Sequence, residues 1–368
     1  MASIDHFNLF IDLKYQYYAN NCQFQSDIES NPSINLPYKY STMNMQPTMT
    51  PTMMANNAHK DIPGNPSTAT SSQINLNDRS NGKPLKALGE EDWTFWKENG
   101  YVIIKNAITK EQAQKTADFL WAFEEKDPAD KNTWYAPPRA EMRMTELINS
   151  GMVEVYNHQY LWDNRQTQKV YDAFTDVWGS EKLWVTIDRA NLNFPMQEGF
   201  EFKGFIHWDY DPETKPQNVQ GVIALADQMD ENMGGFQCIP SLMREYDTWK
   251  LSQPEDRNRF RPDIKGYEDK MVKVKLEAGD LLIFNSLLPH GIRPNLSENK
   301  VRIAQYISMM PVQENDEAQR QWRINSWQNR IAPEGYAFPG DPREWEKTKY
   351  ETAALNELGK KLLGLDSW

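Results

Sequence analysis

The sequence predicts a mainly β protein with helices packed outside its sheets, as a sandwich or jelly roll. From about residue 184 to 310, short apolar and β-branched runs alternate with stretches rich in Pro, Gly, Asn and Asp, which is typical of antiparallel strands joined by turns. Before and after this region, apolar residues recur at helical spacing. We expect strands over 184–194, 219–226, 235–239, 271–276, 281–284 and 301–310.

The folded region begins with a helix and a strand. Trp93 and Trp96 give the helix an apolar side, Gly100 is a typical helix stop, and residues 101–104 form a β-branched run that predicts a strand. Two polar residues three positions apart then form a capping-box pattern, which predicts a second helix running to about residue 123. These capping residues are Thr109 and Gln112. Further helices are expected over 139–150, 165–177, 314–330 and 344–363.

The chain divides into an extension and one large domain. Residues from about 20 to 82 are mostly Asn, Ser, Thr, Pro and Met with little apolar periodicity, so they bury too little apolar surface to offset the entropy of ordering. We therefore expect residues 1–84 to be mostly disordered. Residues 85–368 are expected to form the domain, with a C-terminal helical extension from about residue 312.

Composition and charge exclude several classes of protein. The 368 residues include 40 Lys and Arg against 52 Asp and Glu, a net charge of −12, which disfavours binding to nucleic acid or to anionic membranes. Cys22 and Cys238 lie far apart without a CxxC pattern, so we expect neither a disulfide framework nor a zinc–thiolate site. No apolar run is long enough to span a bilayer, and no secretory signal is evident at the N-terminus. The expected location is the cytoplasm.

The five histidines can be weighed one by one. His6 and His59 lie in the extension, and the aromatic neighbours of His158 favour a packed or hydrogen-bonding role. His207 and Asp209 are two positions apart after a short apolar pair, and in an extended segment such residues share one face. One metal ion can then take both side chains as ligands, although this spacing alone is weak evidence.

His290 and Arg302 supply the further constraint. His290 comes at the exit of an apolar strand, and after a polar loop the chain returns in a strand that carries Arg302. Two imidazoles and one carboxylate on one side of an Fe(II) octahedron leave three positions open, which is the facial triad of non-haem iron oxygenases. An α-keto acid fills two open positions and dioxygen the third, and a buried arginine fork suits the keto acid's distal carboxylate.

Together these features resemble the phytanoyl-CoA hydroxylase family of Fe(II)- and 2-oxoglutarate-dependent dioxygenases, over about residues 85–311. The features are HWD at 207–209, His290 in a PHG context, Arg302 on the next strand, the segment GYVIIKNAITKEQ after a helix, and ENMGGFQCIPSL at 231–242. The resemblance implies a double-stranded β-helix core (jelly roll, cupin-like) with N- and C-terminal helices. Its cofactors would be Fe(II), 2-oxoglutarate and dioxygen.

The resemblance also implies roles for individual residues. His207, Asp209 and His290 would be the iron ligands, and Arg302 would pair with the C5 carboxylate of 2-oxoglutarate. Asn193 would touch the cosubstrate. Where the family often has a hydroxyl residue two places after the distal histidine, this chain has Ile292, and the adjacent Arg293 competes with Arg302 or faces the substrate.

We expect hydroxylation of an unactivated C–H bond in a small metabolite or natural product. In related halogenases a small residue replaces the carboxylate, so Asp209 favours hydroxylation over halogenation. Desaturation, cyclisation and epoxidation stay open, as do the substrate's identity and the oligomeric state. Two other readings are a catalytically idle metal- or metabolite-binding scaffold or sensor, and a metal-dependent isomerase or hydrolase on a similar barrel.

Overall fold

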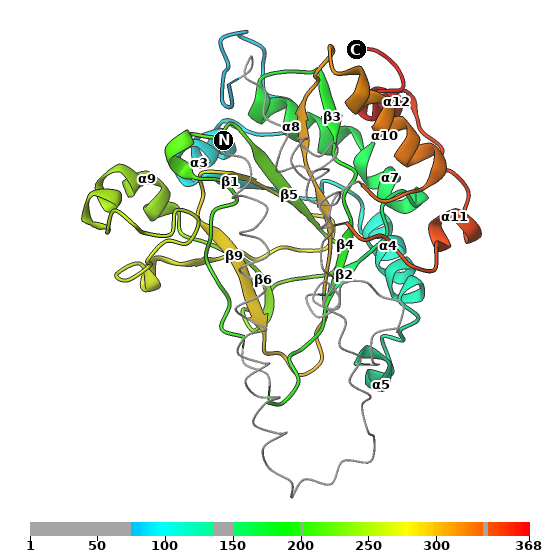
Figure 1. Ribbon diagram of the computed structural model, residues 1–368, viewed down its shortest axis with the longest axis horizontal. Coiled ribbons are helices and arrows are strands. Elements are labelled where there is room, and N and C mark those ends of the chain that lie inside the picture. The colour runs from blue at the N-terminus through cyan, green and yellow to red at the C-terminus, as the bar shows by residue number, and fades with distance from the viewer. Residues whose placement is uncertain (1–74, 136–150, 200–201, 334–337) are drawn as a thin grey trace, which may run out of the picture. The chain divides into compact units, whose positions relative to one another are not determined.

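The computed structural model describes residues 75–135, 151–199, 202–333 and 338–368 (Figure 1). All of them belong to one unit that spans Ile62–Trp368. Residues 1–74 of the expected extension and the helix expected over 139–150 lie outside the described residues. Leu76 is already buried in the core, and Asn77 accepts a hydrogen bond from the indole of Trp96.

The larger of two main sheets has six antiparallel strands. Their order across the sheet is β1-β8-β5-β10-β4-β2. The strands are β1 (Tyr101–Ile104), β2 (Met152–Val153), β4 (Ala190–Asn193), β5 (Val219–Ala224), β8 (Leu281–Asn285) and β10 (Arg302–Ile307). Every pairing between neighbours is antiparallel, so the strands alternate in direction across the sheet.

The smaller main sheet has three strands in the order β7-β6-β9, namely Val272–Lys273, Met233–Cys238 and His290–Asn295. A separate pair joins β3 (Leu183–Val185) to β11 (Met309–Pro311). Val222 and Phe284 of the large sheet share one apolar cluster with Phe236 of the small sheet, so the two sheets enclose an inner core. This arrangement confirms the predicted jelly-roll class, although the described strands do not close into a barrel.

Helices cover the outer face of the large sheet. Val219 and Ile223 of β5 point away from the inner core and into a second cluster that contains residues of the flanking helices. These helices are α3 (Glu90–Asn99), α4 (Lys110–Phe123), α5 (Lys131–Trp134), α7 (Gln159–Arg165), α8 (Gln168–Trp178), α10 (Glu317–Asn329), α11 (Trp345–Lys349) and α12 (Glu357–Leu363). Helix α9 (Pro240–Trp249) packs instead in a separate cluster with Ile206 and Trp208. In Figure 1, α9 lies on the opposite side of the domain from α10, α11 and α12. No helix in the described ranges is both long enough and apolar enough to cross a membrane.

The local signals at the N-terminal end of the domain are confirmed. Gly100 ends α3 with φ 71°, the left-handed conformation that glycine tolerates. The Thr109 hydroxyl accepts from the Gln112 amide, and the Gln112 side chain accepts from the Thr109 amide, so the capping box forms at the start of α4. Strand β1 has the predicted bounds.

Other boundaries differ from the expectation. The strands expected over 184–194 and 301–310 are each two strands, and β9 occupies the segment after His290 that was expected to be a polar loop. Helix α9, which begins at Pro240, was not predicted. The helix expected over 344–363 is split into α11 and α12 because side chains of the α7 region capture the backbone between them. The Gln159 amide oxygen accepts from the Ala354 amide at 2.7 Å, and that of Gln166 accepts from the Asn356 amide at 2.8 Å.

Candidate metal centre

The two site histidines are aligned by their own backbones. The His207 amide donates to the His290 carbonyl at 2.8 Å, and the His290 amide donates to the His207 carbonyl at 3.0 Å, in an isolated antiparallel bridge. The chain before His207 lies so close to β9 that a Cβ on Gly291 would sit 1.7 Å from the Phe205 carbonyl oxygen. Glycine at position 291 therefore permits the backbone contact that places one imidazole beside the other.

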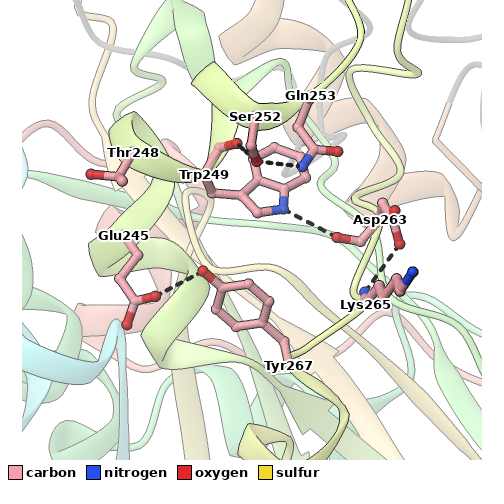
Figure 2. A pocket seen from close by; sticks show the side chains of 8 residues that line it. All are labelled: Glu245, Thr248, Trp249, Ser252, Gln253, Asp263, Lys265 and Tyr267. Carbon is pink, nitrogen blue, oxygen red and sulfur yellow. Dashed lines mark hydrogen bonds between the residues drawn. The ribbon is translucent and has the colours of Figure 1, made fainter.

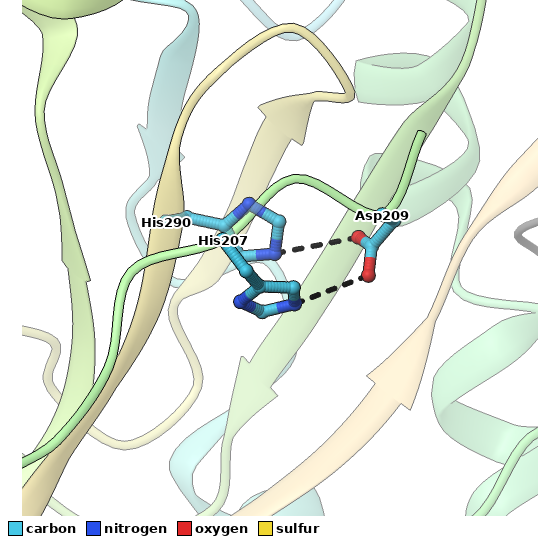
Figure 3. Close-up of side chains that lie close together, drawn as sticks. All are labelled: His207, Asp209 and His290. Atoms are coloured by element: carbon cyan, nitrogen blue, oxygen red, sulfur yellow. Dashed lines mark hydrogen bonds and ion pairs between the residues drawn. The ribbon is translucent and has the colours of Figure 1, made fainter. Parts of the chain in front are cut away.

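Three potential ligand atoms converge at this bridge. The Nε2 atom of His207 lies 3.2 Å from Asp209 Oδ1, and Nε2 of His290 lies 3.4 Å from Asp209 Oδ2 (Figure 3). One ligand atom from each of the three residues lies within 4.8 Å of the others. Adjacent ligands about 2.1 Å from an octahedral ion are about 3 Å apart, so both histidine–aspartate distances suit neighbouring positions on such an ion.

Hydrogen bonding of the imidazoles also fits a cation. The His290 Nδ1 atom lies 2.9 Å from the Leu288 carbonyl, which only accepts, so Nδ1 carries a proton. In the neutral ring Nε2 is then an acceptor, and it faces a carboxylate oxygen that is also an acceptor. A shared metal ion satisfies both atoms. The His207 ring has a buried Nδ1 with no hydrogen-bond partner among the described residues, so it too is incompletely satisfied.

The local electrostatics favour the ligand forms of these groups. Burial lowers the pKa of His207, which keeps that imidazole neutral. Burial opposes ionisation of Asp209, but the influence of the neighbouring His207 and His290 side chains outweighs this and holds its pKa well below the usual value. The intervening Trp208 points the other way, as expected from strand alternation. It is buried, donates from its indole nitrogen to the Leu287 carbonyl, and packs against Trp249.

Two buried arginines lie on strands β9 and β10. Arg302 at the start of β10 donates from Nη1 to Asn191 Oδ1 at 2.8 Å and from Nε to Gln228 Oε1 at 3.3 Å. Arg293 on β9 donates from Nη1 to the Phe236 carbonyl at 2.7 Å. Burial, and then the nearby charge of Arg302, lower the pKa of Arg293 to about 10. Within the described ranges neither arginine forms an ion pair with a carboxylate, so two neighbouring buried cations lack an anion.

Asn193 lies beside Arg302, but its side chain does not bond to that arginine as the side chain of Asn191 does. It is the register partner of Arg302 across β4 and β10, and its side-chain Oδ1 is buried without a hydrogen-bond partner in the part of the chain described. Asn191, two residues earlier on the same face, contacts Arg302 directly. The structure therefore groups Asn193, Arg293 and Arg302 at one end of the inner core, while His207, Asp209 and His290 form the separate three-ligand cluster.

Comparison with known proteins identifies the family. Residues 96–304 match the family model of phytanoyl-CoA dioxygenase (PhyH), which is more than half of the chain and includes all six predicted site residues. The chain belongs to the phytanoyl-CoA dioxygenase family. This confirms the resemblance seen in the sequence and makes the protein a member of a family of Fe(II)- and 2-oxoglutarate-dependent dioxygenases.

Relatives of this dioxygenase-family chain include Ava biosynthesis cluster protein O from Aspergillus versicolor, 25% identical over 272 residues that cover 67% of this chain and 84% of the relative. A Dictyostelium discoideum protein that carries the phytanoyl-CoA dioxygenase name is 24% identical over 321 residues, covering 74% and 86%. Among solved structures, GlcNAc-inducible gene 2 protein (GIG2) from Candida albicans has a TM-score of 0.55 at 13% identity and covers 77% of this chain and 78% of its own. That last similarity shows the fold alone.

Three polar residues at the dioxygenase site were missed by the sequence interpretation. Gln220 donates to Asp209, and Asn191 and Gln228 accept from Arg302. The available signal was a polar residue at an inward position of a strand whose other inward residues are apolar. On β5, Gln220 lies on the same inner face as the apolar residues Val222 and Ala224.

Two other features lie outside the metal centre. His158 is the N-cap of α7 and stacks on Phe119 with ring centroids 3.6 Å apart, so its predicted packing role is confirmed. A pocket beside α9 contains none of the predicted site residues (Figure 2). Several of its polar groups bond to one another or to the backbone, as the Tyr267 hydroxyl does to Glu245 and the Trp249 indole does to the Asp263 carbonyl.

Proposed function

We propose that the protein is an Fe(II)- and 2-oxoglutarate-dependent oxygenase that hydroxylates an unactivated C–H bond of a small metabolite or natural product. In the balanced reaction, one oxygen atom of O2 enters succinate and the other enters the substrate, and 2-oxoglutarate loses CO2. The observation that carries the proposal is the convergence of His207, Asp209 and His290 in a domain that also buries two arginines, neither of which forms an ion pair within the described residues.

His207, Asp209 and His290 would hold the iron, which when bound supplies the redox chemistry that couples decarboxylation of the keto acid to oxidation of the substrate. The proton on His290 Nδ1, bonded to the Leu288 carbonyl, leaves Nε2 free to bind metal and fixes the orientation of the ring. The carboxylate of Asp209 occupies the position that halide takes in related halogenases. Its presence supports hydroxylation.

Arg302 is the better partner for the C5 carboxylate of 2-oxoglutarate. Its Nη2 makes no hydrogen bond within the described ranges, and its other nitrogens are oriented by the side chains of Asn191 and Gln228. Arg293 instead uses both terminal nitrogens on the backbone carbonyls of Phe236 and Val274. We assign Arg293 and Asn193 to the wall of the cosubstrate site. A net charge of −12 supports a small-molecule substrate and no binding to nucleic acid or membranes.

The test is anaerobic reconstitution of the full chain with Fe(II), followed by titration with 2-oxoglutarate. Bidentate binding of the keto acid to iron produces a weak visible charge-transfer band, and aerobic turnover would then release succinate. A band that is absent from iron-loaded protein would contradict the proposal. A band without succinate release, on any pool of small metabolites, would instead favour the catalytically idle scaffold of the same fold.

A further inference from the structure

Gln220 makes a direct contact with the candidate iron ligand Asp209. Its Nε2 donates to Oδ2 of the Asp209 carboxylate from β5. The amide must present its nitrogen here, because its oxygen would face the carboxylate acceptor to acceptor. Strand alternation places Gln220 on the inner face with Val222 and Ala224, so the contact follows from the register of β5 in the large sheet.

Metal binding changes the hydrogen bonds available to Asp209. In the structure the carboxylate faces Nε2 of His207, Nε2 of His290 and the Gln220 amide. When both imidazoles use Nε2 to bind a metal, neither has a proton there to donate. Gln220 is then the one remaining donor to this carboxylate in the part of the chain that the structure describes.

We infer that Gln220 is a positioning residue that keeps Asp209 bound to the metal through a single oxygen, an inference that rests on the proposed function. An octahedral ion with three protein ligands has three open positions, and a chelating keto acid plus dioxygen uses all three. If both oxygens of Asp209 bound the metal, one of those positions would be lost. By holding Oδ2, the Gln220 amide keeps that position free.

The test compares two variants that both remove the donor. Gln220→Glu has nearly the same shape without the N–H group, and Gln220→Leu is apolar. Gln305→Leu is the matched control, because Gln305 is also a strand glutamine that donates from Nε2, but to the Leu161 carbonyl on the outer face of β10. Thermal unfolding of the metal-free proteins checks that each variant folds.

Two readouts are independent of turnover. The first is the visible spectrum of the Co(II)-substituted protein, which reports coordination. The second is the concentration of 2-oxoglutarate that half-saturates the anaerobic Fe(II) charge-transfer band. We expect both Gln220 variants to retain bound metal and to show an altered Co(II) spectrum. Their half-saturating concentration of 2-oxoglutarate should rise by about tenfold or more, the scale typical of groups that support metal ligands. Gln305→Leu should match the wild type in both.

The outcomes separate this inference from the proposed function. If the wild type forms no band with Fe(II) and 2-oxoglutarate, the proposed function fails before Gln220 is tested. If the wild type forms the band and both folded Gln220 variants give the same spectrum and the same half-saturation, the positioning role is overturned. An effect of Gln220→Glu without an effect of Gln220→Leu would also overturn it, because the added charge and not the lost donor would then be responsible.

Discussion

His207 and His290 hold each other by two reciprocal backbone hydrogen bonds, of 2.8 and 3.0 Å, and this pairing sets the separation of their imidazoles. The ring centroids are 4.7 Å apart. A metal site built this way depends on main-chain pairing as much as on the ligands. Substitutions that touch only the backbone contact should therefore affect metal binding.

Gly291→Ala tests this dependence. The new Cβ would lie 1.7 Å from the Phe205 carbonyl oxygen, so the segment that leads to His207 must move away from β9. We expect a loss on the order of 3–5 kcal/mol in the free energy of unfolding, as for other severe core clashes, and weaker Mn(II) binding. Calorimetric titration with Mn(II) and denaturant unfolding measure the two effects. Gly89→Ala, where a Cβ meets Asp92 at an ordinary 3.5 Å, is the control and should keep its metal affinity.

Removal of a ligand should abolish metal binding. His207→Ala, Asp209→Ala and His290→Ala each leave two ligands, so we expect Fe(II) affinity to fall beyond detection and succinate formation to stop. His158→Gln is the matched control, since that histidine stacks on Phe119 outside the site. Undiminished succinate formation in any of the three ligand variants would exclude that residue as a ligand.

Arg302 and Arg293 should respond differently to truncation. Arg302→Ala removes the proposed charge-assisted fork, so the 2-oxoglutarate concentration at half-saturation should rise by about 10- to 100-fold, with Arg302→Lys intermediate. Arg293→Ala removes hydrogen bonds to the Phe236 and Val274 carbonyls, so its main effect should be a lower melting temperature. Titration of each Fe(II)-loaded variant with 2-oxoglutarate, followed by the charge-transfer band, shows which arginine binds the cosubstrate. The reverse pattern would reassign the cosubstrate contact to Arg293.

Glu346 should make stability depend on pH. Burial raises the pKa of its carboxyl from 4.5 to about 7, although the amides of Tyr156 and Asn157 donate to it at 2.7 and 2.6 Å. The folded state therefore holds this proton more tightly than the unfolded state. The contribution of Glu346 to the free energy of unfolding is greatest below pH 4.5. It falls as the pH rises toward 7, by about 3 kcal/mol in all.

Glu346→Gln removes this titration. Denaturant unfolding at pH 5 and pH 8 should therefore show a smaller loss of stability with rising pH in the variant than in the wild type, because other titrating groups are common to both proteins. Equal pH dependence in the two proteins would mean that the folded-state pKa of Glu346 is not raised.

Local sequence patterns predicted much of the fold. The capping box at Thr109, the stop at Gly100 and strand β1 involve residues within a few positions of each other, and such interactions can be read from spacing. Helix α9 also had a local signal, because Pro240 favours the first turn of a helix, but its position directly after an apolar strand obscured that signal. The start of α12 also had a local signal, the N-cap Asn356, but the break before it is held by Gln159 and Gln166 far away in the chain.

The sequence by itself determined which residues are candidates for the metal site. His207 and Asp209 share a face because side chains in an extended segment alternate with a period of two. Only the tertiary structure decided that His290 pairs with His207 and that Gln220 reaches Asp209. It also decided that, among the described residues, the terminal Nη2 of Arg302 stays unbonded while both terminal nitrogens of Arg293 bond to backbone carbonyls. The physical reason is that strand register and side-chain hydrogen bonds between distant segments are set by packing of the whole core, which local periodicity does not encode.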